Sequence, residues 1–161
     1  MNFIIPYSEA SNLRSFLPRT VERLVFTNGC FDLLHAGHVR YLTAARALGD
    51  ALVVGVNGDA SVRALKGPTR PINSEQDRAE VLAGLRAVDA VVIFPESRAT
   101  HLIELLRPEI YAKGGDYTVE TLEAGERAVL EKINCSMHFI PLLQGRSTTS
   151  ILEKASALAQ M

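Results

Sequence analysis

Two histidines three positions apart, His35 and His38, are the residues of this chain whose types and spacing best suit chemistry. They open a helical pattern that begins near residue 36, and residues 24–26 before them form an apolar run typical of a strand. The pair therefore lies on a strand-to-helix turn, with Gly37 between the two rings. A helix N-terminus carries unpaired N–H groups and a partial positive charge, which attract phosphate. Imidazoles on one face of that helix add directional donors, so the turn predicts a bound nucleotide phosphate and attack on it.

The residues just before the histidines are expected to hold the nucleotide. Gly29 permits an unusual backbone angle or a close approach by a ligand. Cys30 has no base near it in the sequence, which indicates a buried and inert thiol. Asp32 either fixes a histidine tautomer or ties down the turn, and the sequence favours neither. The nucleotide-binding candidates in this turn are Thr27, Asn28, Gly29, Cys30, Phe31 and Gly37.

A second phosphate site is predicted where hydroxyl residues open the last helical segment. Ser147 or Thr148 can cap that helix, while its N–H groups and Arg146 hold phosphate. The competing interpretation is a cap-rich helix start with a surface arginine. The candidates here are Arg146, Ser147, Thr148 and Thr149.

Basic residues surround a proline-containing loop in the middle of the chain. Lys66 begins the loop, and Arg70 and Arg78 accompany it. A mobile loop with fixed charges can close over a polyphosphate and neutralise it, although each cation alone is also explained as solvated surface. Lys66 is assigned to catalysis together with His35 and His38.

Polar residues also follow the second and fourth predicted strands. Lys113 ends a strand, the two glycines after it let a backbone approach a substrate, and Asp116 can accept sugar hydroxyls. Asp59 is most simply explained as a turn residue at a helix start. The substrate-binding candidates are Asn57, Asp59, Lys113, Gly114 and Asp116.

Alternating strand and helix patterns must position all of these residues. The run at 51–57 is almost continuously apolar, which is typical of a strand covered by helices on both faces. The alternation predicts an α/β fold: a Rossmann-like, doubly wound, five-stranded parallel sheet with helices on both faces, whose ligands bind beyond the carboxyl ends of the strands. Residues 1–20 are expected to form an N-terminal helical extension outside the main fold, and 21–161 a single domain. The expected strands are 23–27, 51–57, 90–94, 109–113 and 137–141, and the expected helices are 8–17, 36–48, 60–65, 75–85, 98–106, 122–133 and 147–159.

Composition excludes several other classes of protein. The net charge of −1 gives no basic field for nucleic acid, and the chain has no apolar run long enough for a membrane span. The first ten residues lack the pattern of a secretory signal, and two cysteines form neither a disulfide framework nor metal-type spacing, so a cytoplasmic protein without a protein-bound metal is expected. The glycine motifs of P-loop kinases and dinucleotide dehydrogenases are absent.

These motifs carry a family resemblance. His35-Ala36-Gly37-His38 resembles the HxGH signature of the nucleotidyltransferase superfamily, and segments 28–32 and 147–150 resemble its cytidylyltransferase-like branch. Segments 57–67, 70–73, 112–118 and 145–151 are similar to D-glycero-β-D-manno-heptose 1-phosphate adenylyltransferases. The resemblance covers about residues 22–155.

The resemblance implies a single displacement, in which the sugar 1-phosphate attacks the α-phosphorus of ATP and pyrophosphate leaves. It implies that His35 and His38 act on the transition state, and that Lys66, Arg146 and the 147–149 N–H groups hold the triphosphate. Lys113 and Asp116 would face the sugar phosphate or the nucleoside. Mg²⁺ would bind through the ATP phosphates, the protein would be a homodimer, and a sugar kinase supplied elsewhere would make the substrate.

Three alternatives remain open at this stage. One is a related transferase that uses CTP and a small phosphoalcohol such as glycerol 3-phosphate. Another is a nucleotide-binding module without catalysis, and the last is a purely structural Rossmann-like domain.

Overall fold

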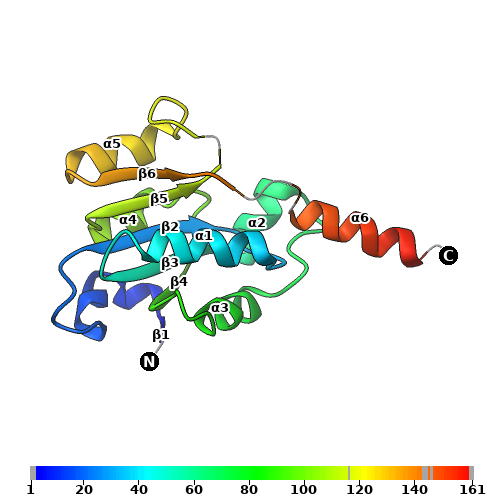
Figure 1. The fold of residues 1–161 in the computed structure, drawn as a ribbon, viewed down its shortest axis with the longest axis horizontal. Coiled ribbons are helices and arrows are strands. Elements are labelled where there is room, and N and C mark those ends of the chain that lie inside the picture. The colour runs from blue at the N-terminus through cyan, green and yellow to red at the C-terminus, as the bar shows by residue number, and fades with distance from the viewer. Residues whose placement is uncertain (1–2, 116, 143–144, 146, 160–161) are drawn as a thin grey trace.

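The computed structural model describes residues 3–115, 117–142, 145 and 147–159. Helices and strands alternate through most of this length, as Figure 1 shows. The elements in chain order are β1 (Phe3–Ile5), the 3₁₀ helix η1 (Tyr7–Phe16), β2 (Leu24–Gly29), α1 (Ala36–Arg46), β3 (Ala51–Asn57), α2 (Asp59–Lys66), α3 (Glu75–Ala83), β4 (Ala90–Phe94), α4 (Thr100–Leu106), β5 (Ile110–Gly114), α5 (Ala124–Lys132), β6 (Ser136–Ile140) and α6 (Thr148–Ala159).

The strands form one parallel sheet in the order β1-β4-β3-β2-β5-β6. The predicted α/β class and parallel sheet are confirmed, but the sheet has six strands and not the expected five. The missing strand, β1, pairs with β4 from Phe3↔Ala90 to Ile5↔Val92. Three residues are too few to display a two-residue periodicity, so the sequence pattern gave no sign of this edge strand.

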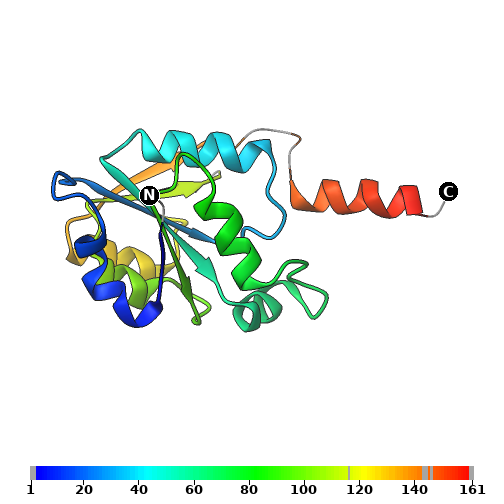
Figure 2. The ribbon, with the colours of Figure 1, turned by 90° about the horizontal axis from the view of Figure 1, so that it is seen from below.

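Helices cover both faces of the sheet, as Figure 2 shows with the sheet seen nearly edge-on. Helices α1 and α3 pack on one face, where Leu42 and Leu82 meet inward side chains such as Val54. Elements η1, α4 and α5 pack on the other face around Phe26 and Leu102. All seven residues of β3 are buried, which explains its continuous apolar sequence.

The N-terminal segment was expected to lie outside the main fold. In the structure it packs on the sheet. The predicted helix is a 3₁₀ helix, and its Ala10 and Leu13 are almost fully buried in the same core as Phe26. Tyr7 Oη donates a hydrogen bond to Glu96 Oε1 at 2.5 Å, which fastens η1 to the loop after β4.

The carboxyl end of the sheet opens between β2 and β5, where the strand order reverses. Pairing between these strands ends at Phe26↔Tyr111, although both strands continue beyond it. The hydroxyl of Tyr41 from α1 lies at this opening, where it donates to the carbonyl of Ala112 and is 2.6 Å from the hydroxyl of Thr27. Such a reversal point is where open α/β sheets bind ligands.

The last helix, α6, begins beside this end of the sheet and extends away from it (Figures 1 and 2). Its side chains are exposed or half-buried along the whole helix, and Leu158 is 71% exposed. Within the described part of the chain, none of the helices is both long and apolar enough to cross a membrane.

Candidate functional site

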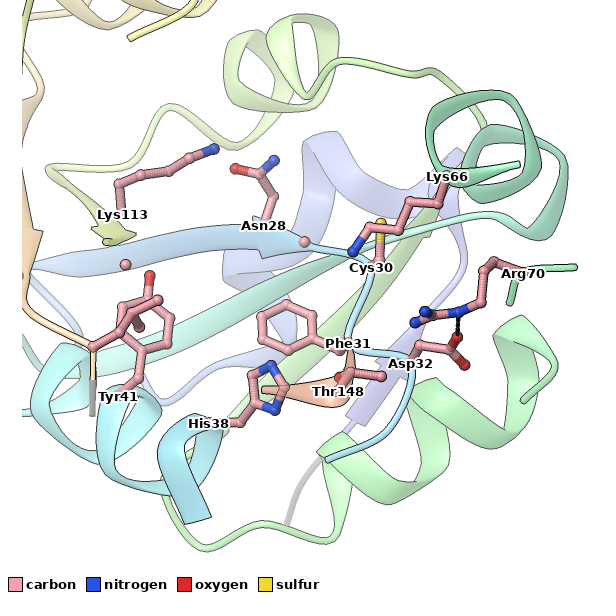
Figure 3. Close-up of a pocket in the computed structure, with 13 residues that line it drawn as sticks. Asn28, Cys30, Phe31, Asp32, His38, Tyr41, Lys66, Arg70, Lys113 and Thr148 are labelled. Carbon is pink, nitrogen blue, oxygen red and sulfur yellow. Dashed lines mark hydrogen bonds and ion pairs between the residues drawn. The ribbon is translucent and has the colours of Figure 1, made fainter. Parts of the chain in front are cut away.

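Two adjoining cavities lie at the carboxyl end of the sheet and share four lining residues, His38, Lys66, Leu142 and Thr148. Together they contain most of the predicted catalytic and nucleotide-binding residues. The first has a volume of about 190 Å³ and is drawn in Figure 3. Its other lining residues are Asn28, Gly29, Cys30, Phe31, Asp32, Tyr41, Arg70, Lys113 and Gly114, and the second cavity adds His35, Gly37, Ser147 and Thr149.

The two histidines form a stacked pair at the start of α1. Their ring centroids are 4.0 Å apart with an interplanar angle of 30°. His35 is the N-cap of the helix, and its Nδ1 accepts a hydrogen bond from the Gly37 N–H at 3.1 Å. A neutral imidazole that accepts at Nδ1 carries its proton on Nε2. The cap therefore sets the tautomer of His35.

His38 is neutral in the free protein. Burial, followed by the nearby His35 and Lys66, lowers the pKa of His38 to about 4. Its Nδ1 is buried and has no hydrogen-bond partner among the described residues. A buried polar atom without a partner is costly, so a bound ligand that supplies one is stabilised at this position.

Phe31 forms the wall behind His38. Its ring centroid is 5.6 Å from that of His38, and its backbone is in the left-handed region with φ of 46°. A Cβ on Gly29 would be 3.0 Å from Cε2 of the Phe31 ring. A larger residue at position 29 would therefore require the Phe31 ring to move.

Asp32 ties the turn to the proline-containing loop, which is one of the two roles that the sequence left open. Its carboxylate accepts the N–H groups of Ile72 and Asn73 and the Nε–H of Arg70, the last at 2.6 Å. Burial alone would raise the pKa of Asp32, but the two N–H donors and Arg70 outweigh it and hold the pKa below its usual value. The ionised carboxylate therefore fixes the loop that follows Lys66.

Lys66 and Lys113 reach the first cavity from opposite sides, as Figure 3 shows. Lys66, at the end of α2, extends over Cys30, whereas Lys113, at the end of β5, extends toward Asn28 (Figure 3). Cys30 is half-buried and lines the cavity; burial raises the pKa of its thiol, partly offset by Lys66 and Arg78. The cavity thus has a cation on each side and the His38 ring near its middle.

A buried carboxylate, Glu126 from α5, supports the Lys113 side of the cavity. Its Oε2 is 3.9 Å from Lys113 Nζ, and its Oε1 accepts the Ala99 N–H. Tyr111 Oη donates to Asn28 Oδ1 at 2.8 Å and lies 3.4 Å from Lys113 Nζ. These contacts hold Lys113 and Asn28 in fixed positions at the carboxyl ends of β5 and β2.

The start of α6 closes the second cavity. Thr148 Oγ1 donates to the carbonyl of Leu33 at 3.1 Å, which joins α6 to the histidine turn. Ser147 Oγ accepts the Ser150 N–H, so of the two cap candidates, Ser147 and Thr148, it is Ser147 that caps the helix. The N-terminus of α6 and that of α1 therefore meet around His38 and Lys66.

Three predicted residues do not line either cavity. Thr27 is fully buried against Tyr41. Asn57 donates to the Ser61 hydroxyl and the Glu96 carbonyl, and Asp59 forms an ion pair with Arg78. Two further candidates, Asp116 and Arg146, lie outside the described residues.

Arg78 and Glu126 are buried charged residues whose importance the sequence did not reveal. Arg78 suggested a loop cation, yet its guanidinium is fully buried and donates to the carbonyls of Cys30, Asn57 and Asn73. It joins the ends of β2 and β3 to the loop before α3. In the sequence, a charged residue in a helix is indistinguishable from an ordinary surface charge. Only the three-dimensional structure shows that these two residues lie on the buried faces of their helices.

Among the described residues, no group of three or more His, Cys, Asp and Glu side chains is placed to hold a metal ion. Asp32 is the one described carboxylate that lines either cavity, and Arg70 already engages it. This donor set is suited to a metal that arrives on phosphate oxygens and needs few protein ligands.

The fold and the HxGH turn at a sheet reversal point define a nucleotidyltransferase. Residues 26–154 match the cytidylyltransferase-like family, and the chain belongs to that family. This confirms the superfamily and branch to which the sequence motifs pointed.

Relatives and solved structures agree with this assignment. The chain is 54% identical over 136 residues to the bifunctional protein HldE of Syntrophotalea carbinolica, and 51% identical over 152 residues to that of Methylobacillus flagellatus. These matches cover 84% and 91% of the chain but 27% and 31% of the relatives, so the chain spans less than a third of their length. A lipopolysaccharide core biosynthesis protein from Thermoplasma volcanium has a TM-score of 0.62 at 26% identity, with 77% of this chain and 98% of that chain covered. Pantoate-beta-alanine ligase from Francisella tularensis, with a TM-score of 0.57 at 14% identity and coverage of 100% and 78%, shares the fold.

Proposed function

We propose that the protein transfers AMP from ATP to D-glycero-β-D-manno-heptose 1-phosphate, giving ADP-heptose and pyrophosphate. The observation that carries the proposal is the stacked His35–His38 pair at the start of α1, beside Lys66 and the start of α6, where the two cavities adjoin. The first cavity extends from His38 and Lys66 to Lys113 on the opposite side. The site can therefore bind one anionic group near Lys66 and another near Lys113. The sequence similarity to heptose adenylyltransferases and the 54% identity to a bifunctional HldE protein support the choice of substrate.

The proposed reaction is one in-line displacement. An oxygen of the sugar phosphate attacks the α-phosphorus, a new phosphorus–oxygen bond forms, and the bond from that phosphorus to the β-phosphate oxygen breaks. Pyrophosphate leaves with the electron pair. The attacking phosphate is already an anion, so no base is needed and catalysis consists of positioning and charge stabilisation.

In the proposed step, several residues that line the two cavities act on the phosphates of the substrates. His35 and His38 donate N–H groups to α- and β-phosphate oxygens, where charge grows in the transition state. Lys66 and the N–H groups at the start of α6 hold the leaving pyrophosphate. Lys113, which Glu126 and Tyr111 position, receives the sugar phosphate on the opposite side of the cavity.

Neutral His38 suits this role. A protonated imidazole would be repelled by Lys66 before the nucleotide binds, whereas a neutral ring keeps one N–H for the phosphate without that cost. Bound phosphate then raises the pKa of His38, because a nearby anion favours the charged ring.

Mg²⁺ would enter the site as part of the ATP complex, with phosphate oxygens as its main ligands. It would neutralise part of the phosphate charge that Lys66 and the helix N-termini also face. The expected homodimer and the cytoplasmic location stay predictions.

The test is pyrophosphate release by the purified protein with Mg²⁺, with ATP and CTP each crossed with heptose 1-phosphate and glycerol 3-phosphate. Release only from ATP with heptose 1-phosphate supports the proposal. Release from CTP with glycerol 3-phosphate would leave the site chemistry intact and overturn the substrates. No release in any combination would favour a nucleotide-binding module without catalysis.

A further inference from the structure

The loop between α2 and α3 presents a third cation, Arg70, to the first cavity, in addition to Lys66 and Lys113. Its side chain is 14% exposed, and its Nε–H donates to Asp32 Oδ2 at 2.6 Å. Its Nη2 is buried and has no hydrogen-bond partner among the described residues. Leaving a donor of a buried guanidinium unpaired is costly, so a ligand oxygen that reaches Nη2 would be stabilised there.

The direction of that free donor is fixed by the chain itself. A guanidinium is planar, so the bond from Nε to Asp32, together with the burial of the Arg70 side chain, restricts where Nη2 can lie. Asp32 in turn is held by the N–H groups of Ile72 and Asn73, and its side chain is only 2% exposed. Arg70 is therefore pre-organised, and little rotamer entropy is lost when it binds a ligand.

The surroundings of Arg70 select an anion. Figure 3 shows its guanidinium on the same side of the cavity as Lys66 and away from Lys113. Among the described residues that line this cavity, Asp32 is the one carboxylate, and it already accepts hydrogen bonds from Arg70, Ile72 and Asn73. The fork of a guanidinium matches the geometry of phosphate oxygens better than an ammonium does.

We propose that Arg70 binds the β- and γ-phosphates of the nucleotide through Nη2, next to Lys66, and that Asp32 is the residue that positions it. The inference rests on the proposed function and deepens it, because it assigns the polyphosphate end of the site. It also explains why the loop after Lys66 is fastened so firmly to the histidine turn. Once pyrophosphate forms, both Arg70 and Lys66 bind it.

Isothermal calorimetry in the presence of Mg²⁺ tests this with three probes: inorganic pyrophosphate, ATP and AMP. Arg70→Gln removes the positive charge. Arg70→Lys keeps the charge, but an ammonium group cannot contact Asp32 and a phosphate in the geometry of a guanidinium. We expect the Kd for pyrophosphate and ATP to rise about tenfold or more in both variants, since a hydrogen bond to a charged group is lost. The Kd for AMP, which lacks the β- and γ-phosphates, should change by less than about twofold. Asp32→Asn should weaken pyrophosphate binding in the same sense through loss of positioning.

Arg14→Gln is the matched control. Arg14 also donates to a carboxylate, that of Glu109, but this exposed pair lies at the amino end of β5, away from the cavity. Thermal unfolding of each variant separates loss of binding from loss of the fold. Unchanged pyrophosphate affinity in a folded Arg70 variant, equal loss of AMP and ATP binding, or no pyrophosphate binding by the wild type would each overturn the proposal. These measurements need no acceptor, so failure of heptose 1-phosphate as a substrate would be seen separately.

Discussion

The pKa of His38 offers a direct test of how the site is built. The structure lowers this pKa to about 4, first through burial and then through His35 and Lys66. At pH 6 such a histidine is about 1% protonated, whereas a histidine with the ordinary value of about 6.5 is about 76% protonated. We therefore expect the imidazole proton signals of His38 to stay almost constant between pH 8 and pH 5.5 in an NMR titration. The variant His38→Gln assigns the signal, because the described chain has three other histidines, His35, His101 and His138.

The same shift makes a prediction about stability. Between about pH 6.5 and pH 4 the unfolded state takes up a proton at His38 that the folded state does not, so the free energy of unfolding falls as the pH falls through this window. His38→Gln should flatten that part of the stability curve. A titration midpoint for His38 near pH 6.5, or an identical stability slope in the variant, would refute the buried, neutral ring described above.

Three substitutions extend the test to other parts of the site. His38→Ala should reduce turnover by about 10²-fold or more and leave the fold intact, as expected for loss of one transition-state donor; near-normal turnover with pyrophosphate release as the readout would contradict the assignment. Gly29→Ala should lower the free energy of unfolding by about 1–3 kcal/mol in urea denaturation, because the new Cβ meets the Phe31 ring at 3.0 Å; a variant as stable as the wild type would show that the ring can move away. Glu126→Gln should lower the free energy of unfolding by about 1–3 kcal/mol, since the half-buried Lys113 loses its carboxylate partner. A variant as stable as the wild type between pH 6 and pH 8 would argue against that ion pair.

Much of the fold could be predicted from the sequence because its central strands are buried on both faces. Strands β3 and β4 have the predicted bounds, since continuous apolar runs ended by polar residues leave little choice. Ser74 caps α3, and its side chain accepts a hydrogen bond from the N–H of Asp77, three positions ahead, which is a local signal. The edge strand β1 carried no comparable signal, because its three residues owe their strand conformation to pairing with β4.

The candidate site divides in the same way. His35 and His38 were found because a helix start and a three-residue spacing are both local properties. Arg78 was missed because three of its four partners, Cys30, Asn57 and Asp59, lie 19 to 48 positions away in the sequence. Glu126 was missed because Ala99, whose N–H it accepts, lies 27 positions away. Sequence reasoning thus located the phosphate-binding turn but not the buried charges that fasten the strand ends around it.

The central claim is attack by the sugar phosphate on the α-phosphorus of ATP, and an isotope experiment tests it most directly. Heptose 1-phosphate labelled with ¹⁸O in its non-bridging phosphate oxygens is converted with ATP and Mg²⁺, and both products are examined by ³¹P NMR and mass spectrometry. The account predicts that all of the label is recovered in ADP-heptose and that the pyrophosphate is unlabelled, since every oxygen of pyrophosphate comes from ATP. Labelled pyrophosphate, or a product other than ADP-heptose, would contradict it.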